Sequence, residues 1–323
     1  MPKTMRAALL DAAGDPAALR IGETSTPDRV NAEFLVKVVA AGVNPLDAST
    51  RSGNGVFGAI HNFPAVLGHD FSGVVVESPF AAHPLRPGDE VFGMVMVPRF
   101  GGSYAEYVSV PSVSLVRKPA TLSHIEAAAA PLAALTAWGM VVELAKAHEG
   151  QRVLVHAGTG TVGHFAIQFA AYFGAHVIAT TSSANHSWLR SLGSAEVVDE
   201  AATGDDPTGL GDTVDVVIDP ASDLERATRS LALIRPGGLL VLHAPTGLDP
   251  GLAEAAEAAG VRTTGYTVAP DGGTLAVIAR LLETGSVRVH VDRIFPLDEI
   301  ADAHRAIEHE TTKGAIVLKV AEG

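Results

Sequence analysis

The sequence predicts an α/β protein with two parts, a doubly wound parallel sheet and a second region built mainly from β-strands. Three observations favour this fold class. Residues 5–117 contain short apolar runs separated by Gly and Pro turns; helix-like and strand-like segments alternate from about residue 123; and a glycine-rich turn joins one of those strands to a helix. The length of 323 residues suits two domains of roughly 100–200 residues each.

Strand-like segments fill the first part of the chain. Residues 34–41, 71–77 and 90–97 are rich in β-branched side chains, and turn clusters at 86–89 and 99–103 interrupt them. Many short strands with Gly and Pro turns predict a small all-β barrel or sandwich.

Helices and strands alternate in the second part. Ser123 is a plausible N-cap for a helix over 124–145, and a buried strand over 152–156 follows. A parallel sheet with right-handed crossovers is the expected result. The tail after residue 267 has the rhythm helix, strand, helix, strand, and periodicity does not decide which domain it joins. Further elements are predicted over 162–173 (helix) and, as strands, over 176–181, 196–198, 214–219, 238–243 and 261–265.

Composition excludes several function classes. The 23 Lys and Arg against 36 Asp and Glu give a net charge of −13, which disfavours nucleic acid and anionic membrane surfaces as partners. The chain has no cysteine, so disulfides, a thiol nucleophile, an iron–sulfur cluster and a thiolate zinc site are excluded. No targeting segment and no run of about 20 apolar residues is visible. We therefore expect a cytoplasmic protein.

The best local motif is the turn over 153–163. Gly158, Gly160 and Gly163 have the G-x-G-x-x-G spacing between a β-branched strand and an amphipathic helix. In a dinucleotide site, one glycine forms the tight turn, one admits the pyrophosphate and one lets the helix pack on the strand. The helix N-terminus then offers unpaired N–H groups to the phosphates. The alternative is a plain tight βα turn.

Cofactor choice depends on the end of the next strand. Residues 180–186 contain no carboxylate that would bind the ribose 2′-hydroxyl of NAD, and their small hydroxyls leave room for a 2′-phosphate. We therefore expect NADPH as the cofactor, and NADH remains an alternative. The other interpretation of the serines in this stretch is a solvated loop or the cap of the next helix. The predicted contacts are Thr181, Ser182, Ser183 and His186.

Ordered motifs along the whole chain carry a family resemblance. They are Ala-Gly-Val-Asn-Pro-Leu-Asp at 41–47, Leu-Gly-His-Asp at 67–70, Gly-Asp-Glu-Val-Phe-Gly at 88–93, Gly-Ser-Tyr-Ala-Glu-Tyr at 102–107, the segment 130–138, the glycine-rich turn, and the tail segments 292–297, 303–306 and 314–319. The chain resembles the medium-chain dehydrogenase/reductase superfamily in its quinone oxidoreductase (zeta-crystallin-like) branch. The resemblance implies a GroES-like catalytic domain over 1–124 and 267–323, and a Rossmann cofactor-binding domain over 125–266.

The sequence lacks the zinc ligands of the superfamily's zinc-dependent members, which hold their metal with Cys, His and Cys or Asp. Here the segment of the first Cys reads Gly-Val-Asn-Pro at 42–45, and a His without partner ligands makes a poor zinc site. His69 and Asp70 lie where the family has a His-Glu pair, and we interpret His69 as a hydrogen-bonded side chain in the active-site floor. No metal is predicted.

The resemblance also implies individual site residues. Asn44, Thr136 and Tyr104 match positions near the nicotinamide and the substrate. The alternatives are capping of the turn before Pro45 for Asn44, helix packing for Thr136 and a mainly structural role for Tyr104. Asp47 ends the Asn44 motif and more often has a structural role. Phe57, His61 and Phe63 lie in the variable loop that would cover the substrate. The implied cofactor contacts, besides the glycines, are Thr161, Val162, His243, Ala244, Pro245, Tyr266, Thr267 and Val268.

Three departures from the family pattern weaken the expectation of NADPH. The stretch 184–186 lacks the usual basic residue, Glu200 stands where a Tyr is common, and Ala315 replaces a Lys. Glu200 would repel a 2′-phosphate, and Arg190 or a protonated His186 would compensate.

Without a metal, the expected acceptor is already electrophilic. A quinone or an α,β-unsaturated carbonyl needs mainly positioning and hydrogen-bond donors at oxygen. The leading hypothesis is therefore NADPH-dependent, zinc-independent hydride transfer to such a molecule. The family resemblance also implies a homodimer, formed through the edge strands of the Rossmann sheets, here near residues 261–265. The alternatives are an enoyl reductase acting on a thioester or biosynthetic intermediate, and a non-enzymatic NADPH-binding protein.

Overall fold

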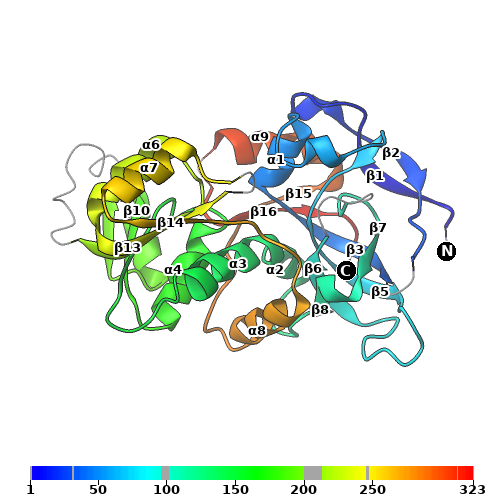
Figure 1. Ribbon diagram of the computed structural model, residues 1–323. Helices are drawn as coiled ribbons and strands as arrows, with labels where there is room; N and C mark the ends of the chain where they lie inside the picture. The colour runs from blue at the N-terminus through cyan, green and yellow to red at the C-terminus, as the bar shows by residue number, and fades with distance from the viewer. Residues whose placement is uncertain are drawn as a thin grey trace. The chain divides into compact units, whose positions relative to one another are not determined.

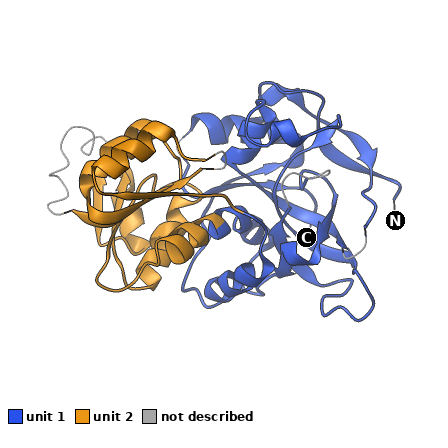
Figure 2. Ribbon diagram, in the orientation of Figure 1, with its two compact units in different colours: residues 1–135, 269–323 blue, residues 136–268 orange. Residues whose placement is uncertain are grey.

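The computed structural model describes residues 2–30, 33–95, 102–199, 213–244, 247–310 and 312–322. The chain divides into two compact units (Figure 2): unit 1 comprises Met1–Leu135 and Ala269–Gly323, and unit 2 comprises Thr136–Val268. No helix in these described ranges is long and apolar enough to cross a membrane.

Unit 1 is built on two sheets (Figure 1). The larger has seven strands in the order β15-β16-β3-β5-β6-β8, with β7 also paired to β3, and the smaller has the order β2-β1-β4. β3 is the longest strand and is buried at ten of its eleven positions, so it forms the centre of this unit. Its bounds and those of its partners are Glu33–Val43 (β3), Thr4–Leu10 (β1), Leu19–Ser25 (β2), Ala65–Val66 (β4), Asp70–Glu77 (β5), Glu90–Met94 (β6), Tyr107–Pro111 (β7) and Leu115–Arg117 (β8).

The C-terminal tail belongs to unit 1. β16 (Ala315–Lys319) pairs antiparallel with β3, with Ile316 opposite Val43, and parallel with β15 (Val291–Pro296). α9 (Ile300–His309) buries Ile300, Ala303 and Ala306 in the same core as Phe34 and Phe71. α8 (Gly272–Glu283) completes the tail. The order helix, strand, helix, strand is therefore as predicted. The pairing of β16 with β3 shows that the tail joins unit 1, which periodicity did not decide.

The long helix predicted over 124–145 is wrong as a single element. The structure has α2 (His124–Ala128), α3 (Pro131–Trp138) and a π-helical segment over Gly139–Leu144. Pro131 has no N–H and disfavours helical backbone at the residue before it, so the helix restarts there. α2 begins at the predicted N-cap, because Ser123 Oγ accepts the Glu126 N–H at 3.2 Å.

The first domain boundary also differs from the prediction. Ala127 and Ala128 of α2 are fully buried, and Ala128 packs with Ala40 of β3, so this segment is part of unit 1. The boundary falls inside α3, at 135/136 instead of 124/125. The second boundary is at 268/269 instead of 266/267.

Unit 2 is a six-stranded parallel sheet in the order β11-β10-β9-β12-β13-β14. Counted along the chain this order is 3-2-1-4-5-6, the doubly wound arrangement that binds dinucleotides at the carboxyl ends of its strands. The strands are Arg152–Val155 (β9), His176–Thr181 (β10), Glu196–Asp199 (β11), Val214–Asp219 (β12), Ile234–His243 (β13) and Arg262–Tyr266 (β14). The helices are α4 (Gly163–Tyr172), α5 (His186–Ser191), α6 (Leu224–Ser230) and α7 (Pro250–Ala258).

Strand bounds differ from the predictions mainly at the ends. β13 begins at Ile234, four residues before the predicted start, because it continues through Pro236, Gly237 and Gly238. β6 ends at Met94, and the last two residues predicted for it lie outside the described ranges.

Candidate functional site

The glycine-rich turn of unit 2 joins β9 to α4. A Cβ at Gly163 would lie 2.1 Å from the Ala157 carbonyl oxygen, so only glycine allows α4 to pack this closely on the turn. A Cβ at Gly158 would lie 2.9 Å from Leu189 Cδ1. The Gly160 N–H donates to the Ala157 carbonyl at 3.0 Å, which closes the turn. Two of the three glycines thus serve packing.

The N-terminus of α4 presents free donors. Among the described residues, no acceptor receives the backbone N–H groups of Thr161, Val162 or Gly163. Val162, the N-cap, makes no side-chain cap. Unpaired N–H groups at the positive end of a helix dipole bind phosphate oxygens, so the turn fits the pyrophosphate of a dinucleotide.

The segment after β10 contains small polar groups. Thr181 is buried at the end of the strand, and Ser182 and Ser183 are exposed. The Asn185 amide donates to Ser182 Oγ at 3.2 Å, so the loop is partly held by its own side chains. His186 is the first residue of α5 and is half-buried, while Arg190 is exposed in its last turn. Glu200 lies outside the described ranges.

The carboxyl ends of β13 and β14 bring together the other predicted cofactor contacts. The Ala244 N–H donates to the Tyr266 carbonyl at 3.1 Å, and Thr267 Oγ1 donates to the Ala244 carbonyl at 3.4 Å. His243 precedes Ala244 and is half-buried, and burial lowers the pKa of its imidazole. Val268 ends unit 2, and Pro245 lies outside the described ranges.

Tyr266 packs against the π-helical segment. A Cβ at Gly139 would lie 1.9 Å from Tyr266 Cζ, so the ring rests directly on the glycine backbone. Thr136 is buried one turn earlier, in the part of α3 that belongs to unit 2. Short π-helical segments recur at functional sites, and this one fixes the ring of a predicted cofactor contact.

In unit 1, Asn44 lies in a buried polar cluster formed with Asp47, His69 and Asp70. Its amide donates to Asp70 Oδ2 at 2.9 Å, and its backbone N–H donates to Asp47 Oδ2 at 2.9 Å. Asp47 Oδ1 lies 2.6 Å from His69 Nδ1. Asp70 Oδ1 also accepts the Leu132 N–H at 2.8 Å. All four side chains are at least nine-tenths buried.

Burial and mutual charge set the protonation of this cluster. Burial raises the pKa of the Asp70 carboxyl to about 7, although hydrogen bonds from Asn44 and Leu132 partly oppose the change. Burial also acts against charge on Asp47 and His69, but their attraction outweighs it. The pKa of Asp47 is therefore lowered and that of His69 raised. Asp47 and His69 form an aspartate–imidazolium pair, whereas Asp70 titrates near neutrality.

Tyr104 lies beside this cluster and is fully buried. Its hydroxyl makes no well-formed hydrogen bond to a described residue, and its ring meets His304 edge-on at 5.8 Å between centroids. Burial, with the nearby Asp47 carboxylate, raises the pKa of the Tyr104 phenol well above its usual value. Tyr104 therefore stays neutral, and it is placed for packing more than for proton transfer.

A cavity of about 540 Å³ opens beside the cluster within unit 1. Its wall is mainly apolar, with Val56, Ile60, Leu67 and Val95 among its residues. Polar side chains that line it are His61, His69, Asp47, Thr50, Thr24, Ser25 and Asn62. An apolar pocket with a few convergent polar groups suits a small organic ligand.

Of the three predicted substrate residues, only His61 is among those that line this cavity. Phe57 packs on the core of unit 1, and its ring lies 5.7 Å from that of Phe63. Phe63 is 41% exposed. The Phe57 ring therefore lies between the core and the Phe63 ring, and the Phe63 ring is partly exposed to solvent.

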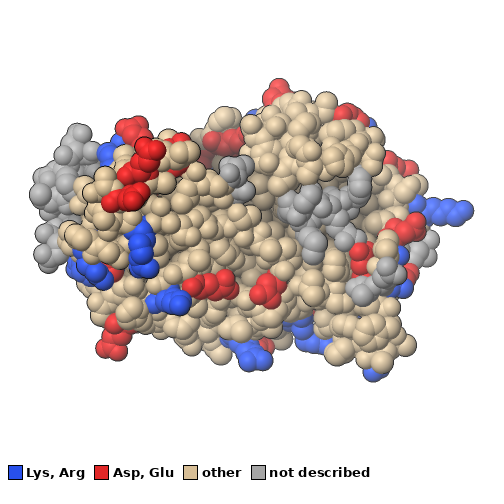
Figure 3. Space-filling model, in the orientation of Figure 1, with Lys and Arg blue, Asp and Glu red and all other residues tan. Residues whose placement is uncertain are grey.

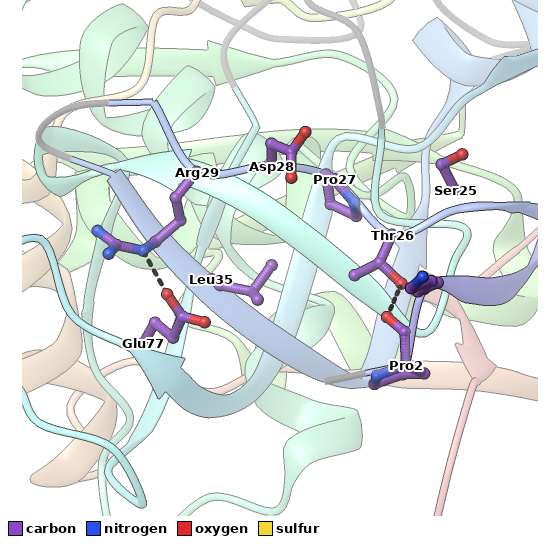
Figure 4. Close-up of a pocket in the computed structure, with 9 residues that line it drawn as sticks. Pro2, Ser25, Thr26, Pro27, Asp28, Arg29, Leu35 and Glu77 are labelled. Carbon is purple, nitrogen blue, oxygen red and sulfur yellow. Dashed lines mark hydrogen bonds and ion pairs between the residues drawn. The ribbon is translucent and has the colours of Figure 1, made fainter.

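A second hollow, of about 640 Å³, lies near the N-terminus (Figure 4). Its charged residues include Arg29 and Glu77, whose guanidinium and carboxylate pair at 2.9 Å. Arg29 Nη1 also donates to the Glu33 carbonyl at 3.1 Å. These groups satisfy one another, and the hollow contains none of the predicted site residues.

The polar cluster does not fit a catalytic zinc site. Zinc needs three protein ligands and an open position, and cysteine thiolates are absent from the sequence. Asn44 stands in the segment of the first family ligand and donates its amide to Asp70. Across the ranges that the structure describes, no group of three His, Asp or Glu side chains could hold a metal.

Sequence reasoning underestimated Asp47, Asp70 and His304. The sequence suggested a structural role for Asp47 and none for Asp70 beyond its place next to His69, yet the two carboxylates determine the charge of His69 and the orientation of Asn44. Their spacing was the available signal: Asp47 follows Asn44 by three residues, and Asp70 is next to His69. His304 gave no comparable signal, because only the packing of α9 brings it to Tyr104.

Two family models match this chain, and the second match crosses from unit 2 into the tail that belongs to unit 1. Residues 30–120 match the family described as alcohol dehydrogenase GroES-like domain, and residues 192–318 match that described as zinc-binding dehydrogenase. The chain is 33% identical to a 2-methylene-furan-3-one reductase of Solanum lycopersicum, over 98% of this chain and 80% of the relative. It is 32% identical to a chloroplastic NADPH-dependent alkenal/one oxidoreductase of Arabidopsis thaliana, with the same coverage.

The fold of this chain is similar to that of a solved oxidoreductase structure. The quinone oxidoreductase from Coxiella burnetii superposes with a TM-score of 0.91 at 33% identity, covering 99% of this chain and all of that one. The seven-stranded sheet of unit 1 is thus the GroES-like domain, and the parallel sheet of unit 2 is Rossmann-like. The chain belongs to the medium-chain dehydrogenase/reductase superfamily of oxidoreductases, in its quinone oxidoreductase-like branch.

Proposed function

We propose that this oxidoreductase uses NADPH to reduce quinones or α,β-unsaturated carbonyls and that it needs no zinc. The observation that carries the proposal is the turn before α4, where three unpaired N–H groups meet the positive end of a helix. Relatives named for NADPH, for alkenal and enone reduction and for quinone reduction support it. A dihydronicotinamide supplies a hydride when bound.

The proposed cofactor contacts follow from unit 2. Thr161, Val162 and Gly163 offer backbone donors to the pyrophosphate. Ser182 and Ser183 are exposed at the end of β10, where the 2′ end of the cofactor binds in this fold. Tyr266, fixed on Gly139, and the buried Thr136 are proposed to contact the nicotinamide end.

The proposed acceptor follows from unit 1. The apolar wall of the cavity suits a ring or chain of carbon atoms, and its polar side chains can meet a carbonyl oxygen. The Asn44 amide and its backbone N–H already donate to carboxylates, so we propose an acceptor that is electrophilic without metal activation. The face drawn in Figure 3 mixes acidic and basic side chains and supports a small-molecule partner in place of nucleic acid.

The test combines binding with turnover. The purified full chain is titrated with NADPH and NADH, and each reduced cofactor is then mixed with a panel of quinones and enones while its absorbance is followed. We expect tighter binding of NADPH and its oxidation by at least one enone or quinone. Binding without oxidation by any acceptor would favour the non-enzymatic alternative, and tighter NADH binding would contradict the proposed role of Ser182 and Ser183.

Two further expectations join this proposal. β14 is the last strand in the order of the parallel sheet, and an edge strand is suited to pairing with a second copy, so we propose a homodimer. Light scattering of the purified protein tests this, and a monomer would contradict it.

We also propose a cytoplasmic location, which fractionation of the source cells would test.

A further inference from the structure

One ring nitrogen in the cavity of unit 1 has no assigned role. His69 lines that cavity and is 7% exposed. Its Nδ1 is bonded to Asp47, whereas its Nε2 makes no hydrogen bond to any described residue. The ring therefore leaves a single polar atom, Nε2, available to a ligand in a space whose wall is mainly apolar.

Asp47 fixes the ring in this orientation. The Asp47 side chain is fully buried, with one oxygen on His69 Nδ1 at 2.6 Å and the other accepting the Asn44 N–H at 2.9 Å. Because both oxygens are engaged, the carboxylate cannot rotate without losing a hydrogen bond. A carboxylate held in this way orients an imidazole and stabilises its protonated form.

The charges around His69 favour two N–H groups on the ring. Asp47 on α1 (Pro45–Arg51) and Asp70 on β5 raise its pKa against the effect of burial. His304 on α9 also faces Asp47, but burial lowers its pKa to about 4, so it stays neutral. Tyr104 is neutral as well. His61 lines the same cavity. The remaining cation of this region, Arg51, pairs with Glu308.

We propose that His69 Nε2–H binds the carbonyl oxygen of the acceptor and delivers a proton to it, with Asp47 as the positioning residue. This inference rests on the proposed function. In an enone, the β-carbon would gain a hydride from a bound dihydronicotinamide, which would leave as the nicotinamidium cation, and the C=C π electrons would pass through the carbonyl to give an enolate anion. The enolate oxygen takes the Nε2 proton, so the N–H bond breaks as an O–H bond forms. The resulting enol tautomerises to the saturated ketone, and water reprotonates the ring.

The first experiment measures carbonyl binding without turnover. The full chain, free of cofactor, is mixed with acetophenone labelled with ¹³C at the carbonyl, and the carbonyl resonance is recorded. We expect a downfield shift on binding to the wild type, because a donated hydrogen bond withdraws electrons from the carbonyl carbon. His69→Leu should abolish the shift, and His69→Gln should keep a smaller one because the amide still donates. His309→Gln, an exposed histidine substitution, is the matched control and should behave as the wild type.

An unchanged shift in His69→Leu, or no shift in the wild type, would overturn the binding role. If His69→Leu does not fold, His69→Gln decides the matter through the size of its shift. A shift as large as that of the wild type in His69→Gln would then count against the imidazole.

The second experiment measures proton delivery. General acids contribute about 10²–10⁴-fold, so His69→Gln should lower kcat/KM for an enone by at least about 100-fold. The wild-type rate should fall as pH rises through the pKa of His69, because the acid form is lost, and this limb should be absent in the variant. In Asp47→Asn the limb should move to lower pH. Unchanged turnover and pH profile in His69→Gln would overturn proton delivery.

The two experiments separate this inference from the proposed function. If the wild type and His69→Gln reduce enones equally well, the reductase function stands and His69 has no role in proton delivery. If the wild type reduces no enone or quinone but its carbonyl shift depends on His69, the reductase function is contradicted and the binding role of His69 stands.

Discussion

At the scale of single residues, four buried polar side chains in unit 1 form the cluster beside the proposed acceptor cavity. Asn44, Asp47, His69 and Asp70 form hydrogen bonds within the cluster, and burial couples the charges of its ionisable members. The sequence motifs named Asn44 as a site residue, but they could not reveal its bond to Asp70, which is 26 residues away. Hydrogen bonds across strands depend on register, which a single sequence does not encode locally.

Asp70 should make stability depend on pH. Its folded-state pKa is about 7, above the value near 4 of an unfolded aspartate, so stability falls as pH rises from about 4 to about 7. In Asp70→Asn this contribution disappears, and the variant should gain stability relative to the wild type between pH 5 and pH 8. Urea unfolding at both pH values measures it. A wild-type minus variant difference that is constant with pH would be incompatible with a raised Asp70 pKa.

His304 should have the opposite effect. Its folded-state pKa is lowered to about 4, so its contribution to stability is lost as pH falls from about 6.5 to about 4. Neither ring nitrogen has a partner among the described residues. His304→Leu should therefore change stability at pH 7 by less than about 1.5 kcal/mol and reduce the loss in acid. Thermal unfolding from pH 7 to pH 4.5, with His309→Gln as control, checks this. An acid sensitivity equal to that of the wild type would refute it.

At the scale of elements, the turn before α4 and the π-helical segment position the proposed cofactor contacts. The first was readable from the sequence, because glycine spacing, a β-branched strand and an amphipathic helix occur together. The second was not. The pattern over 124–145 is continuously helical, and only the position of Pro131 and the packing of Tyr266 on Gly139 divide it.

Gly139→Ala tests the packing of Tyr266. The new Cβ would overlap the ring, so the ring or the helix must move, and overpacking of this kind costs about 1–3 kcal/mol. We expect that loss of stability together with weaker NADPH binding, measured by urea unfolding and by fluorescence titration.

Gly251→Ala on α7 is the control for this variant. Its Cβ would meet only the movable Asp249 carboxylate, at 3.2 Å, so NADPH binding should be unchanged. Gly139→Ala with wild-type affinity for NADPH would show that Tyr266 is not positioned by Gly139 for the cofactor.

At the scale of the whole molecule, alternation of helices and strands and the order of the motifs predicted the fold class, whereas the strand order came only from the structure. The assignment of the tail needed the family resemblance, because β16 pairs with β3 across more than 270 residues of sequence. Long-range antiparallel pairing leaves no periodic signal that distinguishes it from an extension of the parallel sheet. The boundary inside α3 was missed for a related reason: the sequence of α2 does not show which domain buries it, and the packing of Ala128 on Ala40 of β3 places it in unit 1.

The central claim is that this chain reduces activated carbonyls with NADPH and without a metal. The direct measurement is NADPH oxidation with a quinone or an enone by protein that has been treated with a chelator and analysed for residual zinc. We expect the same kcat/KM before and after treatment. Activity that disappears with the chelator and returns when zinc is added would contradict it.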